Sequence, residues 1–346
     1  MTSTAGPRLQ RAVILLFGAI LATLMTVSTS GAALGGATGT GSDTGAAVSE
    51  RTDVYLKDTA SDVGYEPHGA IYSSFFNSPD VKICPTAIEC ASSTNPVVGS
   101  TSYIFAKLRN PGPYGQGTSS GTLRAYYTTS GGGANWPAHW TPIGASSLVV
   151  APGETVTSIA WPNVPSIGHF CLLLRWESAT DPMSFEGTST SINTQYNNNL
   201  VWKNANTVPA TSGGSPTVRP YALANALREP ANFDLVFRPV EQEVPGVRIV
   251  VDLGPELFER WVKAGRAGDG VKVIGRNQVE VDPNRAQIKD LLINPDERPV
   301  LQLSFAAGEA LQKPYVLQVL QVGPAREGGE KFVVGGVDYT IVPGRG

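Results

Sequence analysis

Short apolar or alternating runs, each ended by turn residues, recur along most of this chain. Residues 102–108 read Ser-Tyr-Ile-Phe-Ala-Lys-Leu and precede an Asn-Pro-Gly-Pro segment, and residues 122–127 precede the glycine-rich segment 130–133. Further runs of this kind occupy 156–161, 169–176 and 200–202. Between 52 and 208, no stretch keeps a helical period for three turns. This spacing predicts antiparallel strands of a β-sandwich.

The second half of the chain repeats the strand pattern and adds one helix. Its strand-like runs occupy 233–237, 247–253, 271–274, 279–281, 300–305, 315–322 and 332–342. Pro255 at a favourable first helical position and Gly265 at the end bracket a short helix. Its apolar stripe consists of Leu257, Phe258, Trp261 and Val262. The pair Gly335-Gly336 indicates a tight hairpin turn within the last run.

These patterns predict an all-β chain with two immunoglobulin-like antiparallel β-sandwich domains. We place the first domain at 50–208 and the second, which carries the short crossover helix, at 232–346. A segment at 209–231 is interpreted as the linker, because its residues 211–216 read Thr-Ser-Gly-Gly-Ser-Pro. The low charged fraction of 16%, with 38 glycines and 26 prolines, favours a loop-rich secreted β protein over a helical one.

Residues 1–32 have the three parts of a secretory signal peptide. Two arginines precede an uncharged apolar run at 12–27, and small residues follow it. This order predicts cleavage after Ala32 or Ala33. The alternative is an uncleaved anchor, for which the apolar run is at the short end. Residues 33–49 are predicted to be a flexible linker of small residues, so the expected location is secreted or at the cell surface.

Three cysteines occur in the chain. Cys84 and Cys90 enclose a loop short enough to close as a local disulfide in an oxidising compartment. Cys171 lies in the apolar run Phe-Cys-Leu-Leu-Leu and is interpreted as a small core residue. A bridge from Cys171 to one of the other two stays open at this point.

Several phrases of the first half resemble a known kind of domain. They are Asp-Val-Tyr-Leu-Lys-Asp at 53–58, Asp-Val-Gly-Tyr-Glu-Pro at 62–67, Ser-Pro-Asp-Val at 78–81, Trp-Pro-Ala-His-Trp at 136–140, the run at 168–176, and the segment at 197–204. Together they resemble the immunoglobulin-like or CARDB-like β-sandwich of secreted bacterial proteins, over about residues 52–206. The resemblance implies stalks, adhesive modules or accessory parts of surface proteins, and it brings no catalytic residues. The second domain resembles only a generic immunoglobulin-like fold.

The acidic residues at the start of the first domain are the candidate metal ligands. Asp53, Asp58, Asp62 and Glu66 lie within fourteen residues around a predicted turn. Carboxylate oxygens gathered in this way suit Ca²⁺. The alternating ligand pattern of a calcium loop is missing, so the competing interpretation is a solvated turn.

Two tryptophans are the candidate platform for a sugar. Trp136 and Trp140 flank a proline in a predicted loop, where exposed indole rings could stack on a glycan. Trp176 and Trp202 lie at the ends of predicted strands and are assigned to the core. The side-chain amides of residues 197–199 are expected to bond to the backbone before the last strand of this domain.

The sequence offers no recognisable catalytic pattern. The three histidines, His68, His139 and His169, are far apart, and no Gly-x-Ser-x-Gly elbow lies in a strand-to-helix context. A net charge of −3 without a basic stripe argues against nucleic acid as a partner.

We therefore expect a non-catalytic secreted or cell-surface protein with a structural or interaction role: adhesion, spacing or extracellular assembly, with a filament subunit as a variant. Its partners would be other protein subunits, including further copies of the chain, or surface ligands. A membrane would be involved only if the signal is not cleaved. The alternative is a carbohydrate-binding module, with calcium as the candidate cofactor. The spacing of the histidines does not predict a zinc site.

Overall fold

The computed structural model describes residues 51–68, 74–165, 170–210, 213–308, 311–324 and 329–344. The predicted signal peptide (1–32) and the predicted flexible linker (33–49) lie outside the described residues. In the part that the structure describes, strands dominate, and the two helices have 7 and 10 residues. The predicted all-β class is therefore confirmed, with antiparallel pairing in nearly every ladder.

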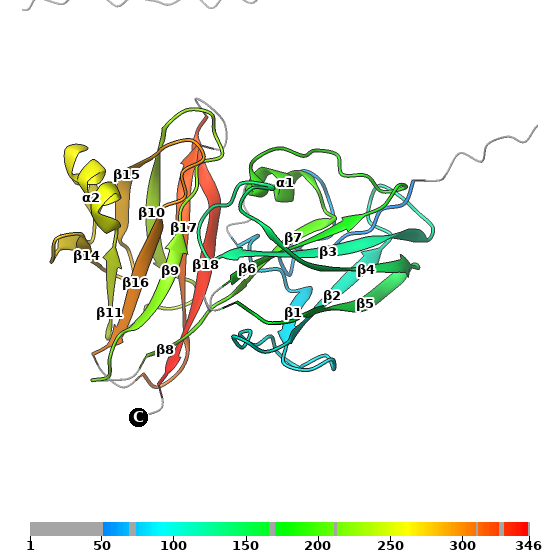
Figure 1. The fold of residues 1–346 in the computed structure, drawn as a ribbon, viewed down its shortest axis with the longest axis horizontal. Coiled ribbons are helices and arrows are strands. Elements are labelled where there is room, and N and C mark those ends of the chain that lie inside the picture. Colours follow the sequence, from blue (N-terminus) through cyan, green and yellow to red (C-terminus); the bar gives the residue numbers. More distant parts are fainter. Residues whose placement is uncertain are drawn as a thin grey trace, which may run out of the picture. The chain divides into compact units, whose positions relative to one another are not determined.

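The first sandwich, which we define as residues 51–206, contains two antiparallel sheets (Figure 1). Its strands are β1 (Val81–Cys84), β2 (Ser102–Asn110), β3 (Ser119–Thr129), β4 (Thr141–Val150), β5 (Gly153–Trp161), β6 (Phe170–Glu177) and β7 (Leu200–Ala205). One sheet has the order β1-β2-β5 and the other β4-β3-β6-β7. Apolar side chains from both sheets form a common core between them.

Helix α1 (Thr190–Tyr196) joins β6 to β7 and was not predicted from the sequence. Ser189 caps its N-terminus, with the side-chain oxygen accepting a hydrogen bond from the Ile192 N–H. Its buried positions are Thr190, Ser191, Asn193 and Thr194. Because the buried face is polar, the helix has no apolar stripe that a sequence pattern could reveal.

Strand β6 is buried on both faces, and this explains its continuous apolar run. Successive side chains of a strand point to opposite sides. Leu172 and Leu174 therefore enter the core of the first sandwich, whereas Cys171 and Leu173 point the other way. On that side they join Trp202 of β7 and Leu320 of the second half of the chain in a separate apolar cluster. One strand thus serves two cores.

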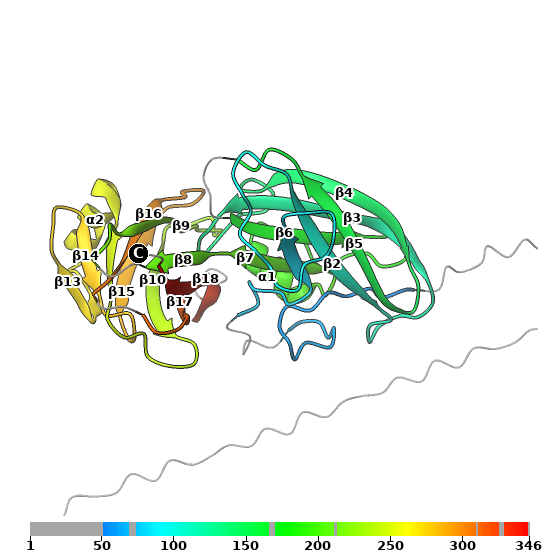
Figure 2. The ribbon, with the colours of Figure 1, turned by 90° about the horizontal axis from the view of Figure 1, so that it is seen from below.

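The second sandwich, residues 207–344, contains a six-stranded and a five-stranded sheet (Figure 2). The first sheet has the order β12-β15-β10-β17-β18-β8 and the second β13-β14-β11-β16-β9. The strands are β8 (Thr207–Ala210), β9 (Thr217–Ala222), β10 (Ala231–Pro239), β11 (Val247–Asp252), β12 (Gly268–Asp269), β13 (Val271–Val273), β14 (Gln278–Val281), β15 (Gln287–Ile293), β16 (Val300–Ala307), β17 (Tyr315–Pro324) and β18 (Lys331–Pro343). The β8–β18 ladder is parallel, which departs from the purely antiparallel prediction.

Helix α2 (Gly254–Lys263) forms where the sequence predicts a helix. A proline lies in its first turn, and Leu257 and Trp261 are its buried residues. The Trp261 indole N–H donates to the Ala267 carbonyl at 3.0 Å, and Gly265 takes a positive φ of 95° just after the helix.

The strand pairing differs from the boundaries expected from the sequence. Residues 209–231 were interpreted as a linker after a first domain ending at 208. Instead, β8 pairs with β18, and β9 pairs with β16, so both belong to the second sandwich. Each of these strands contains a proline, and each lies at the edge of its sheet, where a missing N–H is tolerated.

The glycine-rich segment 130–133 joins the two sandwiches. Gly131 forms a bridge with Ala222 at the end of β9, and the Gly132 N–H donates to the Ala222 carbonyl at 2.9 Å. The predicted hairpin turn at Gly335-Gly336 is wrong, because both residues lie inside β18. A Cβ at Gly335 would overlap the Gly132 carbonyl oxygen. These glycines therefore permit two backbones to approach closely.

Substitution of Gly335 by alanine should weaken this junction. We expect the added methyl group to lower the free energy of unfolding by about 2 kcal/mol, because the overlap is with backbone that has little room to move. Urea denaturation followed by fluorescence measures the effect. Gly308→Ala is the control, because a Cβ there would lie at an ordinary 3.4 Å from the Gly246 carbonyl oxygen. Equal stability of the two variants would contradict the tight junction.

Candidate functional site

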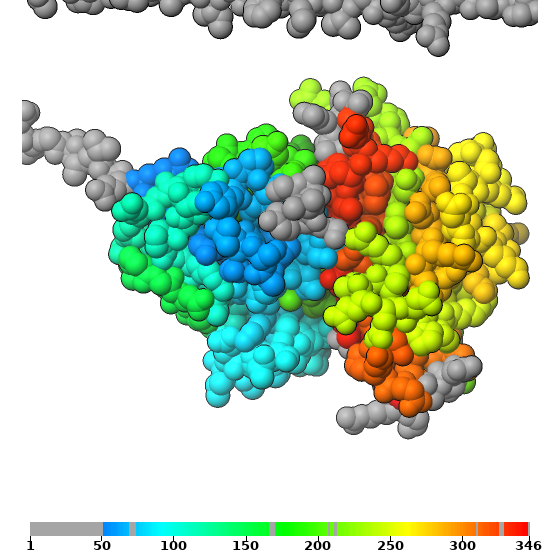
Figure 3. All heavy atoms as spheres, turned by 180° about the vertical axis from the view of Figure 1, so that it is seen from behind, coloured from blue at the N-terminus to red at the C-terminus, as the bar shows by residue number. Residues whose placement is uncertain are grey.

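The segment 51–68 crosses the loops of the first sandwich and is held by its own buried carboxylates. Figure 3 shows this segment in blue on the surface of the first sandwich. Residues 54–56 make one isolated bridge, through Tyr55 and Arg109. The Asp53 carboxylate accepts hydrogen bonds from the Tyr114 N–H at 2.6 Å and from the Asn198 side-chain amide at 2.9 Å. Asp53 therefore ties three distant pieces of chain together.

The asparagines at 197–199 fix this arrangement. Asn197 donates to the carbonyls of Phe185 and Asn193, and Asn199 donates to the Asp181 carbonyl. These backbone contacts confirm the role expected for the amides. Asn198 goes further, because its amide bonds both the Gly64 carbonyl and the Asp53 carboxylate. All three side chains are buried, where unpaired amide groups would be costly.

The four carboxylates predicted to bind calcium separate into two groups. Glu66 accepts from the Asn198 N–H and, at 3.3 Å, from the Ser184 hydroxyl. Asp53 and Glu66 therefore both accept hydrogen bonds from Asn198. Asp58 and Asp62 lie together instead, and with His68 they form a buried cluster. The structure gathers two of the four predicted ligands and adds a histidine.

We call Asp58, Asp62 and His68 the buried cluster. The three residues are 1%, 3% and 5% exposed. His68 Nδ1 lies 2.5 Å from an Asp58 oxygen, and its Nε2 lies 3.7 Å from an Asp62 oxygen. Asp62 also accepts hydrogen bonds from the N–H groups of Asp58 and Gly64. His68 was not among the predicted ligands, because no second histidine lies near it in the sequence, although it follows Asp62 by only six residues.

Burial and charge shift the pKa values in this cluster. Burial raises the pKa of Asp58 to about 7, and contact with His68 opposes the rise. Burial alone would lower the pKa of His68, but the hydrogen bond and charge of Asp58, with the charge of Asp62, outweigh it and raise that pKa. Both groups therefore hold protons more tightly than they would in water.

Four exposed aromatic residues are next in sequence to Glu66 or Ser184 or bond to them, and we call Tyr65, Tyr114, Phe185 and Tyr196 the aromatic patch. Their exposed fractions are 62%, 38%, 42% and 41%. Tyr65 meets Tyr114 edge to face at 6.2 Å between centroids, and Phe185 meets Tyr196 at 5.5 Å.

Glu66 and Ser184 bring the two ring pairs of the aromatic patch into one region. The Tyr114 hydroxyl bonds the Glu66 backbone at both its N–H and its carbonyl. The Ser184 hydroxyl lies within hydrogen-bond distance of the Glu66 carboxylate and of the Tyr196 carbonyl. These rings were not predicted from the sequence, although Tyr65 and Tyr114 lie in Gly- and Pro-containing segments rather than in predicted strands.

The tryptophans proposed as a sugar platform are not exposed together. Trp140 is 7% exposed, packs against Trp202 and donates its indole N–H to the Thr190 hydroxyl at 2.9 Å. Trp136 is partly buried, and the Arg175 guanidinium lies 4.1 Å from the centroid of its ring. Trp140 is therefore buried and Arg175 covers one face of Trp136, and the aromatic patch lies elsewhere.

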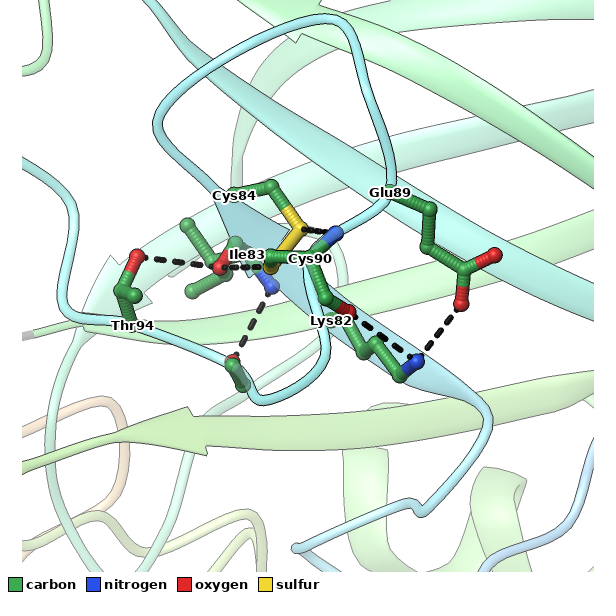
Figure 4. The surroundings of a disulfide bond; sticks show 7 residues. Lys82, Ile83, Cys84, Glu89, Cys90 and Thr94 are labelled. Atoms are coloured by element: carbon green, nitrogen blue, oxygen red, sulfur yellow. Dashed lines mark hydrogen bonds and ion pairs between the residues drawn. A yellow bond between two sulfur atoms is a disulfide. The ribbon is translucent and has the colours of Figure 1, made fainter.

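Cys84 and Cys90 form a disulfide, as Figure 4 shows. Their Cα atoms lie 5.6 Å apart. Lys82 closes the same loop by donating to the Glu89 carboxylate at 2.7 Å and to the Cys90 carbonyl at 3.2 Å. Cys171 is free and buried, with its sulfur 2.6 Å from the Asn204 side-chain oxygen. Burial raises the pKa of the Cys171 thiol, which opposes its use as a nucleophile.

Polar groups elsewhere also have structural roles. His139 accepts a hydrogen bond from the Asn135 N–H at 2.9 Å, and burial, with the charge of Arg298, lowers the pKa of His139 to about 4.

A groove of about 570 Å³ lies in the second sandwich. Two of the arginines that line it pair with acidic neighbours, Arg248 with Glu280 and Arg285 with Asp282. His169 lies outside the described residues. In the part of the chain that the structure covers, we find no helix long and apolar enough to cross a membrane.

Comparison with known proteins gives no family. No family model matches the chain, and no curated protein does so at a significant level. Solved structures with some likeness include the CupB6 tip adhesin from Pseudomonas aeruginosa, with 9% identity, a TM-score of 0.22, and coverage of 77% of this chain and 98% of that one. The collagen adhesin from S. aureus has 11% identity, a TM-score of 0.23, and coverage of 79% and 94%.

A β-glucosidase from Kluyveromyces marxianus is also similar, with 13% identity and a TM-score of 0.19 over 37% of this chain. The chain spans only 15% of the length of that protein. At TM-scores this low, none of the three likenesses carries an inference about function.

Asp181 should make stability depend on pH. Its carboxylate accepts the Val54 N–H at 2.8 Å, and burial, with the charges of Asp53 and Glu66, raises its pKa to about 7. A raised pKa means that the folded state binds the proton more tightly than the unfolded state, so stability falls as pH rises from about 4 to about 7. Asp181→Asn keeps the acceptor and should remove this loss, on the order of 2–4 kcal/mol at about 1.4 kcal/mol per unit of pKa.

Urea denaturation at pH 4.5, 6 and 7.5 measures this effect as the difference between the variant and the unaltered chain. The exposed Glu229→Gln is the control and should follow the unaltered chain. An Asp181→Asn curve parallel to that of the unaltered chain across these pH values would show that Asp181 does not titrate in this range.

Proposed function

We propose that this chain is a non-catalytic protein that acts at the cell surface or after secretion and makes contacts with other molecules through the aromatic patch. The patch is the observation that carries the proposal. Exposed aromatic residues that gather in one place are typical of binding surfaces, because tyrosine rings combine a large apolar area with a polar end. Three of its residues lie in loops and Tyr196 is the last residue of α1, and buried hydrogen bonds of Asn197 and Asn198 hold these segments in position.

Three further features support this role. The Cys84–Cys90 disulfide suits an oxidising compartment, which agrees with the secretory signal predicted at 1–32. The sandwiches share the apolar cluster around Trp202, which favours a stiff support for a contact surface. The buried thiol of Cys171 and the depressed pKa of His139 leave these two groups without an evident catalytic use.

A carbohydrate is the second candidate ligand, and the environment of Glu66 favours it. Aromatic faces stack on sugar rings, while neighbouring hydroxyl and carboxylate groups bond sugar hydroxyls. Here the Ser184 hydroxyl donates to the Glu66 carboxylate at 3.3 Å, and these two residues are next in sequence to Phe185 and Tyr65, one from each ring pair. This proposal places the sugar on the aromatic patch instead of on Trp136 and Trp140.

Binding assays with a double variant test the role of the aromatic patch. The full chain is applied to a glycan array and to a panel of immobilised extracellular proteins. Tyr65→Ala with Tyr196→Ala should weaken binding at least 10-fold, because each ring supplies contact area to the ligand. The control variant is Val149→Ala with Val300→Ala. It removes apolar side chains that are 60% and 48% exposed on strands β4 and β16, and it should leave binding unchanged.

Signals confined to the glycan array would favour the carbohydrate candidate, and signals confined to proteins would favour adhesion. If neither surface binds the chain, or if the tyrosine variant binds as well as the valine variant, the aromatic patch is not the contact surface.

Export has its own test. Mass spectrometry of the culture medium should find a chain that begins at Ala33 or Leu34, because the signal peptide is predicted to be cut after Ala32 or Ala33. Its mass should be two hydrogens below the reduced value, which reports the disulfide between Cys84 and Cys90. An intact chain recovered from the cytosol with three free thiols would contradict a role outside the cytoplasm.

A further inference from the structure

We propose that Asp58, Asp62 and His68 bind one divalent transition-metal ion of the zinc class. The three side chains offer one ligand atom each, and these atoms lie within 4.8 Å of one another. They come from a short stretch of chain that turns back on itself between Asp58 and Gly64. The proposed metal site uses no side chain of the aromatic patch, and it does not require that the patch bind a ligand.

The Asp58 carboxylate supplies the second observation for this site. The side chain is 1% exposed, and its Oδ1 accepts no hydrogen bond from any residue that the structure describes. Its other oxygen lies against the His68 ring. A buried carboxylate oxygen without a partner is unfavourable, because it has lost its hydrogen bonds to water and no hydrogen bond within the protein replaces them. A cation bound beside it would satisfy that oxygen.

The donor set selects the class of metal. Ca²⁺ takes six to eight oxygen ligands, so a buried site with an imidazole nitrogen and two carboxylates does not suit it. Zn²⁺ accepts nitrogen and carboxylate oxygen in a four-coordinate site, and a water molecule can complete three protein ligands. The calcium site expected from Asp53, Asp58, Asp62 and Glu66 is thereby replaced by a smaller site with a different metal.

The distances between the ligand atoms suit this ion after a small adjustment. Neighbouring ligands on tetrahedral zinc lie roughly 3.3 Å apart, given bond lengths of about 2.0 Å. An imidazole binds one ion through one nitrogen, and Nε2 of His68 already lies 3.7 Å from an Asp62 oxygen. Asp58 contacts the other nitrogen, Nδ1, at 2.5 Å, so its carboxylate must turn an oxygen toward the ion. Because the three ligand atoms, one from each residue, lie within 4.8 Å of one another, they need to close by at most about 1.5 Å. The Gly64 N–H, which donates to Asp62 at 2.8 Å, would orient that carboxylate from outside the site.

A bound metal would fasten the segment that carries Tyr65 and Glu66. His68 is also tied to α1, because its N–H donates to the Gln195 carbonyl at 2.8 Å and its carbonyl accepts from the Gln195 amide at 3.0 Å. The ion would therefore join the turn at Asp58 to the end of the segment beside α1. If the ion binds the folded chain and not the unfolded chain, it raises the apparent stability of the folded chain by mass action.

Calorimetry and spectroscopy with the metals alone test the site. The full chain, freed of metal with a chelator, is titrated with Zn²⁺, and Co²⁺ serves as a coloured probe. We expect one ion per chain, a rise in melting temperature with Zn²⁺, and visible Co²⁺ absorption of a four-coordinate nitrogen and oxygen site. His68→Gln and Asp58→Asn should each weaken binding at least 10-fold, and His139→Gln should leave it unchanged.

Far-ultraviolet circular dichroism checks that each variant is folded. If Asp58→Asn does not fold, Asp62→Asn takes its place, because the amide oxygen that this substitution introduces can still accept a hydrogen bond from the turn. The proposal fails if the unaltered chain gives no one-to-one heat with Zn²⁺. It also fails if His68→Gln binds Zn²⁺ and Co²⁺ as the unaltered chain does. In either case the cluster is an internal Asp–His ion pair only.

Discussion

Burial of β6 and β7 on both faces is the constraint on which the rest of the structure depends. Leu172 and Leu174 build the core of the first sandwich, while Leu173 and Trp202 build the cluster that meets Leu320. A slip of one residue in the register of these strands would exchange the two faces. The apolar cluster and the glycine junction at 130–133 together fix where the two sandwiches touch, since close backbone contacts leave no room for other registers.

Buried polar contacts have a comparable role in the loops. The first sandwich alone would leave the segment 51–68 with few apolar anchors, because Val54 and Leu56 are its core residues. Hydrogen bonds from Asn198 to Asp53 and Gly64 hold the remainder. The aromatic patch and the buried cluster both lie on this segment and its neighbours. Binding residues are commonly found on loops that a rigid scaffold positions.

Most of the strands, the helix α2 and the loop between Cys84 and Cys90 could be anticipated, since each depends on residues close together in the chain. The strands β1, β4 and β15 were not predicted. Helix α1 could not, because its buried face is polar. Strand β9 and the end of β8 were interpreted as linker because the run Thr-Ser-Gly-Gly-Ser-Pro at 211–216 lies between them. Of the proposed ligands, Asp58 and Asp62 come together as neighbours in sequence, whereas Asp53 and Glu66 turn toward Asn198, more than 130 residues away.

The sequence by itself determined the periodicity of the strands, the turn residues between them and the residue types available for chemistry. Only the tertiary structure decided which partners those residues meet. Trp140 is buried because Trp202 and Thr190 lie against it, and Tyr196 is exposed because its helix turns the ring outward beside Phe185. The physical reason is that strand periodicity and turns depend on residues close together in the chain. The burial of a side chain and its partners depend on contacts between residues far apart in the chain, and a single stretch of sequence does not show those contacts.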